Sequence, residues 1–329
     1  MIKMEKSHVP VAANSHAGMS GKNNEDNYLV TAYEMNEFNP ARVMLAVLCD
    51  GVGGHQAGEV ASEIGVNVIT EEIGNSNGEN LPRTLTRAIQ KASQSVNQQA
   101  QNNLGGPGRA GMGSTTAVAC LIGNRLYTAT VGDSRIYLLR NDKIQQLSKD
   151  HTWIQDALDV GLITPEQVPG HPNTHVIRRY LGGPNLPEVD IRMFLYGYEN
   201  DEQAEANQGT RLQKQDNLLL CSDGLTDLVS DQEVFEIVAE HGTDLNSAVD
   251  ELIDLANARG GHDNITVVLF SVPADIGIEP HEQQAPPPKI VAATPEPEPK
   301  QKKKSGCFPM LVLSLVGLAA IFSIATTLI

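Results

Sequence analysis

Short apolar runs recur along the first 272 residues, each bounded by glycine, asparagine or aspartate. Runs of aliphatic and β-branched residues with such boundaries are typical of β-strands. The pattern predicts strands at residues 42–49, 114–122, 126–131, 135–139, 217–221 and 265–271.

Amphipathic stretches between these runs predict four helices. The first begins near Glu59, and the second begins near Leu81 and carries apolar residues along one face. A capping box that starts at Ser230 opens the third helix, and Asp244 can cap a fourth, which Gly260 ends. Strands are grouped with strands and helices with helices, so an α+β fold of antiparallel sheets covered by helices is favoured over a doubly wound parallel sheet.

The composition changes after residue 272. Residues 273–304 contain eight prolines in 32 positions, which predicts an extended, unfolded linker. A ligand for a proline-binding domain is the alternative. The sequence thus predicts a folded domain over residues 1–272, followed by this linker.

The last part of the chain, residues 305–329, reads as a membrane anchor. Residues 308–329 are 22 consecutive residues without a charge. At about 1.5 Å per residue they span a hydrocarbon core of about 30 Å, and they lack the polar stripe of a buried core helix, which is the alternative. The lysine-rich segment 300–304 stays in the cytosol by the positive-inside rule, so we expect a single-pass tail anchor.

Charge and cysteine content narrow the function classes. The formal net charge is −16, and the acidic excess lies entirely in residues 1–272, because residues 273–329 carry five charges of each sign. This excludes nucleic-acid binding by bulk electrostatics and disfavours phosphate-rich partners unless metal ions intervene. The four cysteines are far apart and no apolar signal-peptide core opens the chain, so we expect reduced thiols and a cytoplasmic domain.

Aspartates stand at the ends of the predicted strands. Asp50 and Asp223 each close an apolar run and precede a glycine, Asp263 stands just before a run, and Asp133 just after one. Each Asp-Gly pair alone is typical of a turn. Four buried carboxylates, however, need compensating charge, and only Arg135 is close in sequence to any of them. An oxygen-rich, cysteine-poor set of this kind favours Mg²⁺ or Mn²⁺ over Zn²⁺.

Seven short motifs then occur in a recognisable order. They are Asn-Glu-Asp-Asn at 24–27, Asp-Gly-Val-Gly-Gly-His at 50–55, Gly-Ser-Thr-Thr at 113–116, Val-Gly-Asp-Ser-Arg at 131–135, Asp-His at 150–151, Ser-Asp-Gly-Leu-Thr-Asp at 222–227 and Gly-His-Asp-Asn at 261–264. Over roughly residues 8–272 this order resembles the bacterial PPM (PP2C-type) serine/threonine phosphatases. The resemblance implies a four-layer α-β-β-α sandwich of two antiparallel sheets, with a binuclear metal centre at one edge.

The resemblance also implies ligands for two Mn²⁺ or Mg²⁺ ions and for a third, weaker ion that many bacterial members bind. Asp50 is the expected bridging ligand. The other expected ligands are the carbonyl of Gly51 with Asp223 and Asp263, the acidic pair Glu25 and Asp26 for the second ion, and Asp133 and Asp227 for the third.

Two positions depart from the family pattern. The family usually has an arginine that grips phosphate five residues before the aspartate of its Asn-Glu-Asp motif, and Gly21 stands there. The neighbouring Lys22 offers a point charge without the bidentate fork, and we consider it as the substitute. The general-acid histidine of eukaryotic members directly follows the Asp-Gly pair, whereas His55 comes after three further residues, which makes it a weak candidate for that role.

Residues 150–183 resemble the flap beside the active site, and the lone histidines His151 and His175 within it are expected to be structural. The implied activity is hydrolysis of phosphoserine and phosphothreonine in proteins, opposing a serine/threonine kinase. A membrane-tethered pseudophosphatase that binds phosphoproteins without turnover is the alternative. A regulatory phosphatase acting on anti-sigma-factor-type partners is a second one, because the fold is shared and selectivity lies in the flap.

Overall fold

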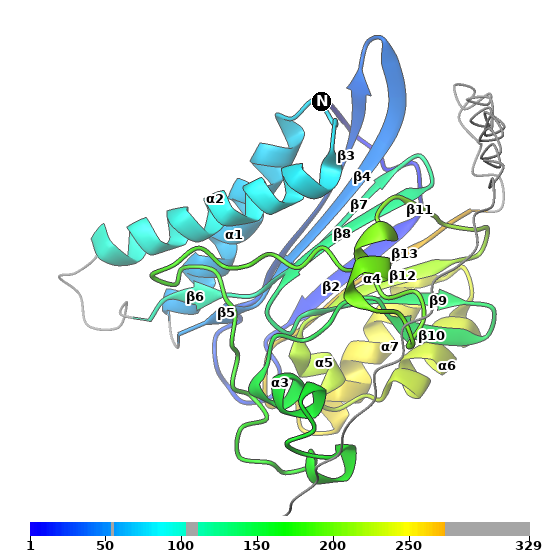
Figure 1. Ribbon diagram of the computed structural model, residues 1–329. Coiled ribbons are helices and arrows are strands. Elements are labelled where there is room, and N and C mark those ends of the chain that lie inside the picture. Colours follow the sequence, from blue (N-terminus) through cyan, green and yellow to red (C-terminus); the bar gives the residue numbers. More distant parts are fainter. Residues whose placement is uncertain (54–55, 103–110, 274–329) are drawn as a thin grey trace, which may run out of the picture. The chain divides into compact units, whose positions relative to one another are not determined.

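Two antiparallel β-sheets lie face to face between two pairs of helices (Figure 1). The structure, a computed structural model, describes residues 1–53, 56–102 and 111–273, which belong to one unit, Met1–Glu282. The first sheet contains, in spatial order, β1 (Ile2–Met4), β3 (Asn27–Asn36), β4 (Asn39–Cys49), β7 (Thr116–Ile122), β8 (Arg125–Val131) and β11 (Thr210–Arg211). The second contains β10 (Lys143–Gln146), β9 (Arg135–Arg140), β12 (Asn217–Cys221), β13 (Ile265–Ser271) and β2 (Val11–His16).

Helices cover the outer face of each sheet. The long helices α1 (Gln56–Gly74) and α2 (Leu81–Asn102) pack on the first sheet, and α6 (Asp231–His241) and α7 (Leu245–Ala258) pack on the second. A two-stranded pair, β5 (Gly51–Val52) with β6 (Gly113–Ser114), extends beyond the first sheet. The short helices are α3 (Trp153–Asp159), the 3-10 turn η1 (Pro165–Gln167), α4 (Asp201–Ala206) and α5 (Asp223–Thr226).

Alternation of side chains along the central strands builds three apolar layers. In β4, Ala46 and Leu48 point between the two sheets, whereas Leu45 and Val47 point toward α1 and α2. In β12, Leu219 contributes to the layer beneath α6 and α7. Because both faces of these strands are covered, their sequences are continuous apolar runs with no polar alternation. The expected α+β fold with two antiparallel sheets flanked by helices is confirmed.

All six predicted strands are present, with small shifts at their ends. The stretch 114–122 is divided at Thr115, whose N–H donates to the carbonyl of Asp50 (2.8 Å) and so leaves the ladder. The four predicted helices are also present, and Ser230 and Asp244 accept the N-cap hydrogen bonds of α6 and α7. The strands β2 and β3 were not predicted, because their sequences carry many polar residues.

Within the described ranges, no helix is long and apolar enough to cross a membrane. The predicted anchor, residues 305–329, lies outside the described residues, as does the predicted linker apart from Pro273. The boundaries of the three predicted parts therefore stay predictions.

Candidate metal centre

Strand register brings the first two carboxylates together. Asp50 directly follows β4 and Asp26 directly precedes β3. These strands are antiparallel with Asn27 opposite Cys49, so Asp26 and Asp50 emerge side by side at the same edge of the first sheet. The charge of Asp26 accordingly acts on Asp50: burial and then this charge raise the pKa of Asp50 well above its usual value.

The second sheet supplies its carboxylates at the same place. Asp223 is the first residue of α5 and is separated from the end of β12 by Ser222 alone, and Asp263 stands just before β13, which pairs with β12. Asp133 lies in the connection between β8 and β9, which belong to different sheets. Burial, followed by the charges of Asp133 and Asp227, raises the pKa of Asp223 well above its usual value. The four aspartates predicted from strand ends thus form one cluster with Asp26 and Asp227.

The glycine of each Asp-Gly pair permits a close backbone approach. A Cβ at Gly51 would collide with the backbone of Gly58 in α1, and a Cβ at Gly224 would collide with the carbonyl oxygen of Asn264. These glycines therefore let α1 and the loop before β13 reach the carboxylates. The two Asp-Gly motifs are packing requirements of the site, in addition to being turns.

Asp26 is the most deeply buried of the acidic pair. Ser222 and Thr266 donate hydrogen bonds of 2.7 Å and 2.6 Å to its Oδ2. Burial nevertheless raises the pKa of Asp26 to about 6, because the two hydroxyls compensate only in part for desolvation. Glu25 has a different setting: it lines the open cleft, and its side chain lies against Gly58.

Three buried carboxylate oxygens in this cluster have no hydrogen-bond partner: Oδ1 of Asp26, of Asp133 and of Asp223. An unpartnered buried carboxylate oxygen is costly, and several together repel one another. Divalent cations with all-oxygen ligands remove both costs, and Mn²⁺ and Mg²⁺ prefer such ligands. The residues present therefore fit a centre for these ions.

Arg135, the one nearby cation in the sequence, does not neutralise the cluster directly. Its guanidinium donates to both oxygens of Asp150, at 3.0 Å and 2.7 Å, and to the hydroxyl of Tyr137. Burial and the charge of Asp150 raise the pKa of Asp133 to about 7, which Arg135 offsets only in part. The positive charge that this cluster needs has to come from elsewhere.

A cleft of about 630 Å³ opens onto the cluster. Asp50, Asp223 and Asp263 line its floor, and Lys22 and His175 are the lining side chains that can carry positive charge. Gly21 also lines the cleft and has a φ of +74°, with nothing within 4 Å of a Cβ built on it. Lys22 thus lines the same cleft as Asp50, Asp223 and Asp263, and its role as a phosphate contact stays a prediction. His55 lies outside the described residues, so its role as an acid stays a prediction.

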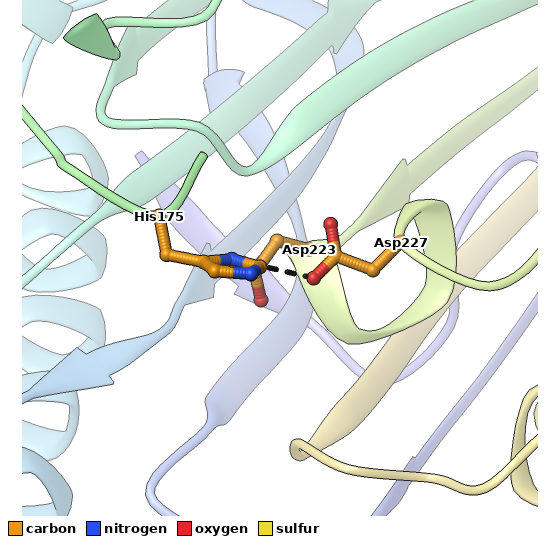
Figure 2. A group of neighbouring side chains, drawn as sticks. All are labelled: His175, Asp223 and Asp227. Atoms are coloured by element: carbon orange, nitrogen blue, oxygen red, sulfur yellow. Dashed lines mark ion pairs between the residues drawn. The ribbon is translucent and has the colours of Figure 1, made fainter. Parts of the chain in front are cut away.

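The two flap histidines differ. His151 is structural, as predicted: it is 4 % exposed, accepts the N–H of Gly132 at Nδ1 (3.0 Å) and bonds Asp190 through Nε2 (3.1 Å). His175 has no such packing. Its side chain is 66 % exposed, and Figure 2 shows its imidazole directed toward Asp223 and Asp227. His175 therefore lacks the buried setting of His151, and a structural role for it stays a prediction.

The family model of Protein phosphatase 2C matches residues 15–156 and 203–265. This chain belongs to that family. Among similar proteins, the serine/threonine phosphatase stp of Listeria innocua is 34% identical over 250 residues, covering 75% of this chain and 89% of its own length. The serine/threonine protein phosphatase PstP of Mycobacterium tuberculosis is 35% identical over 262 residues, which are 79% of this chain and 44% of that protein.

Solved structures of this family share the fold. The M. tuberculosis phosphatase PstP/Ppp superposes with a TM-score of 0.64 at 32% identity, covering 80% of this chain and 99% of that one. A structure of the PstP catalytic domain in complex with two manganese ions gives a TM-score of 0.63 at 32% identity, covering 80% of this chain and 98% of that one. The serine/threonine phosphatase of S. agalactiae gives 0.67 at 28% identity, covering 80% and 100%.

Sequence reasoning missed the groups that support the acidic residues. Ser222 and Thr266 hold Asp26, and Asn264 accepts the backbone N–H of Glu25 at 2.7 Å. Each stands within three residues of Asp223 or Asp263 in the sequence. Small polar residues beside a strand-end aspartate were the available signal.

Proposed function

We propose that this phosphatase hydrolyses phosphoserine and phosphothreonine side chains of proteins with two Mn²⁺ or Mg²⁺ ions in the cleft. Water attacks phosphorus, the bond from phosphorus to the side-chain oxygen breaks, and that oxygen takes up a proton. The products are inorganic phosphate and a free hydroxyl. When bound, two such ions lower the pKa of a shared water and neutralise phosphoryl oxygens. The observation that carries this proposal is the set of buried, unpartnered carboxylate oxygens of Asp26, Asp133 and Asp223, the last of which lines the cleft.

The chain's own residues then have distinct tasks. Asp50, Asp223 and Asp263, with the carbonyl of Gly51, would hold the ions at the floor of the cleft, and Glu25 and Asp26 would complete the second site. Ser222 and Thr266 fix one oxygen of Asp26, which leaves the other free to face an ion or its water. A phosphoprotein binder without turnover is not favoured, because the full set of carboxylates is retained.

The first test is hydrolysis of p-nitrophenyl phosphate and of a phosphothreonine peptide, with and without Mn²⁺. We expect turnover of both substrates that requires the metal. Tight phosphopeptide binding without release of phosphate would instead favour the alternative, a protein that binds phosphoproteins without turnover.

Lys22 is the expected phosphate contact in place of the missing arginine. Lys22→Ala should raise KM for a phosphopeptide by about ten-fold, the cost of one hydrogen bond to a charged group, with little loss of stability because the side chain is exposed. Lys22→Arg is the matched control, which should keep or lower KM. Steady-state kinetics and thermal melts measure both effects.

Gly21→Arg restores the guanidinium of the usual pattern and should also lower KM. The positive φ of Gly21 disfavours any other residue there, so this variant should lose about 1 kcal/mol of stability. An unchanged KM in all three variants would show that the metal ions alone hold the phosphate.

We further propose that residues 305–329 anchor the phosphatase in a membrane, with the catalytic domain in the cytoplasm and residues 273–304 as a spacer. The uncharged run after a lysine-rich segment supports this, and so does the proline content of the spacer. Substrates would then be membrane-proximal phosphoproteins modified by a serine/threonine kinase.

Truncation after Pro299 should therefore release a soluble and fully active phosphatase, whereas the full chain should resist extraction from membranes with alkaline carbonate. Fractionation with immunoblotting and an activity assay of each fraction measure this. Recovery of the full chain in the soluble fraction, or loss of catalysis on truncation, would assign the apolar segment to the folded domain.

A further inference from the structure

A groove lies at the end of β13 that is remote from the metal centre. Asp263 stands just before the first residue of this strand, and Pro273 stands just beyond its last residue. The seven residues of β13 span about 23 Å at about 3.3 Å per residue. The groove at the far end has a volume of about 700 Å³, and among the described residues it shares no lining residue with the cleft over the metal centre.

Apolar side chains of the two helices on the second sheet line this groove. Phe235 and Val238 come from α6, and Leu245 is the first residue of α7. Val238 and Leu245 belong to the apolar layer beneath these helices, and Phe235 packs against that layer while staying partly exposed. Ala239 also lines the groove and is exposed. An apolar surface is therefore accessible from outside at this place.

A polar group in the groove lacks a partner. Oδ1 of Asn217, the first residue of β12, is buried and accepts no hydrogen bond from the residues that the structure describes. A buried acceptor without a donor is costly, so such groups are almost always paired. An extended segment lying in the groove would offer its backbone N–H groups as donors.

The chain reaches this groove where its described part ends. The N–H of Val272 donates to the carbonyl of Asp216 (2.8 Å), and the N–H of Gln215 donates to the carbonyl of Val272 (2.9 Å). These bonds extend the pairing of β12 and β13 beyond both strand ends. Pro273 lines the groove and has no N–H to continue the pairing. The residues that follow are thus attached directly to a lining residue of the groove.

The sequence that follows Pro273 matches the groove. Ile276 and Ile278 are the only branched aliphatic residues within 274–289. In an extended segment, residues two apart lie on the same face, so both isoleucines can face the apolar side of the groove. Lys214, an exposed lining residue, has no ion pair with any described residue and is available to the acidic side chains that flank the two isoleucines.

We propose that residues 274–279 of this chain dock in the groove, with Ile276 and Ile278 against Phe235 and a backbone N–H donating to Oδ1 of Asn217. The free linker then begins after the docked segment and not at Pro273. Its starting point lies at the end of the domain remote from the metal centre, so the proline-rich part is held away from the cleft. This docking does not depend on the proposed membrane anchor.

Two other occupants compete with this segment: the same residues of a second copy, and a separate protein. The covalent link favours the chain's own segment. A short tether gives a segment an effective concentration on the order of millimolar at a neighbouring site, which a second copy or a separate protein has to match in solution.

The experiment is hydrogen exchange with mass spectrometry on the purified full-length protein in detergent. After correction for intrinsic rates, the amides of residues 275–279 should exchange about 10- to 100-fold more slowly than those of residues 289–294. Ile276→Asp should abolish this protection, because it places a charge against the apolar side of the groove. Ile290→Asp is the matched control, since it makes the same change outside the docked segment, and it should leave the protection of residues 275–279 intact.

A second pair of variants tests the groove itself. Ala239→Glu adds bulk and negative charge at an exposed lining position of α6, so it should also abolish the protection. Gln232→Glu adds the same charge at an exposed position of α6 that does not line the groove, and it should retain the protection. Turnover of p-nitrophenyl phosphate should stay at the wild-type level in all four variants, because the groove is remote from the metal centre.

Exchange of residues 275–279 at the rate of residues 289–294 in the wild-type protein would overturn the proposal and leave the groove to a separate protein. Protection that persists in Ala239→Glu would overturn it as well. Protection that disappears on dilution, together with a dimer in light scattering, would assign the groove to a second copy. Loss of turnover in Ile276→Asp would contradict a docking site remote from the metal centre.

Discussion

Asp50→Asn is expected to reduce turnover by at least about 1,000-fold, equivalent to about 4 kcal/mol of transition-state stabilisation, even in saturating Mn²⁺. The amide keeps the size of the side chain but loses the charge that would bridge two ions. The fold should persist, because the substitution removes repulsion with Asp26 and Asp223 in the metal-free cluster. Steady-state kinetics of p-nitrophenyl phosphate hydrolysis over a Mn²⁺ titration measures the loss.

Asp250→Asn is a suitable control for that variant. It also removes one carboxylate charge, but from the exposed face of α7, where Asp250 accepts a hydrogen bond from Asn14. The control should retain wild-type turnover. Comparable activity of Asp50→Asn and wild type in saturating Mn²⁺ would refute a centre bridged by Asp50.

The metal-free protein is expected to lose stability as pH rises from about 4 to about 7. In the folded state the pKa of Asp26 is raised to about 6 and that of Asp133 to about 7, against 3.8 for the unfolded chain. The folded state therefore retains protons that the unfolded state releases in this window, which disfavours folding by an amount on the order of a few kcal/mol. Mn²⁺ should reverse the trend by neutralising the ionised carboxylates, so its stabilising effect should grow with pH.

Thermal melts in metal-free buffer from pH 4 to pH 8, repeated with Mn²⁺, measure this effect. Carboxylates whose pKa is lowered by their partners, such as Asp190 beside Arg192, lose their contribution only below this window. Asp133→Asn should flatten part of the slope. A melting temperature of the metal-free protein that stays level or rises between pH 4 and pH 7 would contradict the prediction.

The central part of the fold could be predicted from sequence because burial on both faces leaves a strong signal. The strands β4, β12 and β13 each contain at least four consecutive apolar residues, and the caps at Ser230 and Asp244 mark the starts of α6 and α7. The strand β2 lacks that signal because it lies at the edge of its sheet and alternates with polar residues. Pairing with β13 over six residues, and not its own composition, makes it a strand.

The candidate site likewise has residues that the sequence predicts and a residue whose position it does not predict. Asp50, Asp133, Asp223 and Asp263 could be predicted as site residues from their positions at strand ends. A carboxylate beside a buried apolar run is costly unless a partner compensates its charge. The position of His175 could not be predicted, since it depends on how the flap folds back through the bonds between Trp153 and Val176. No periodicity of the local sequence encodes that contact.

The flap is joined to the core at two separate points, and this has an evolutionary consequence. At one end His151 exchanges hydrogen bonds with Gly132, and at the other Leu181 exchanges them with Ser114. The segment between can vary in sequence while both attachments and the apolar layers stay intact. The family model in fact matches on either side of residues 157–202 and not within them. Recombination or drift confined to the segment between the two attachments could redirect the enzyme to new phosphoproteins without renewed selection on the two sheets and their helices.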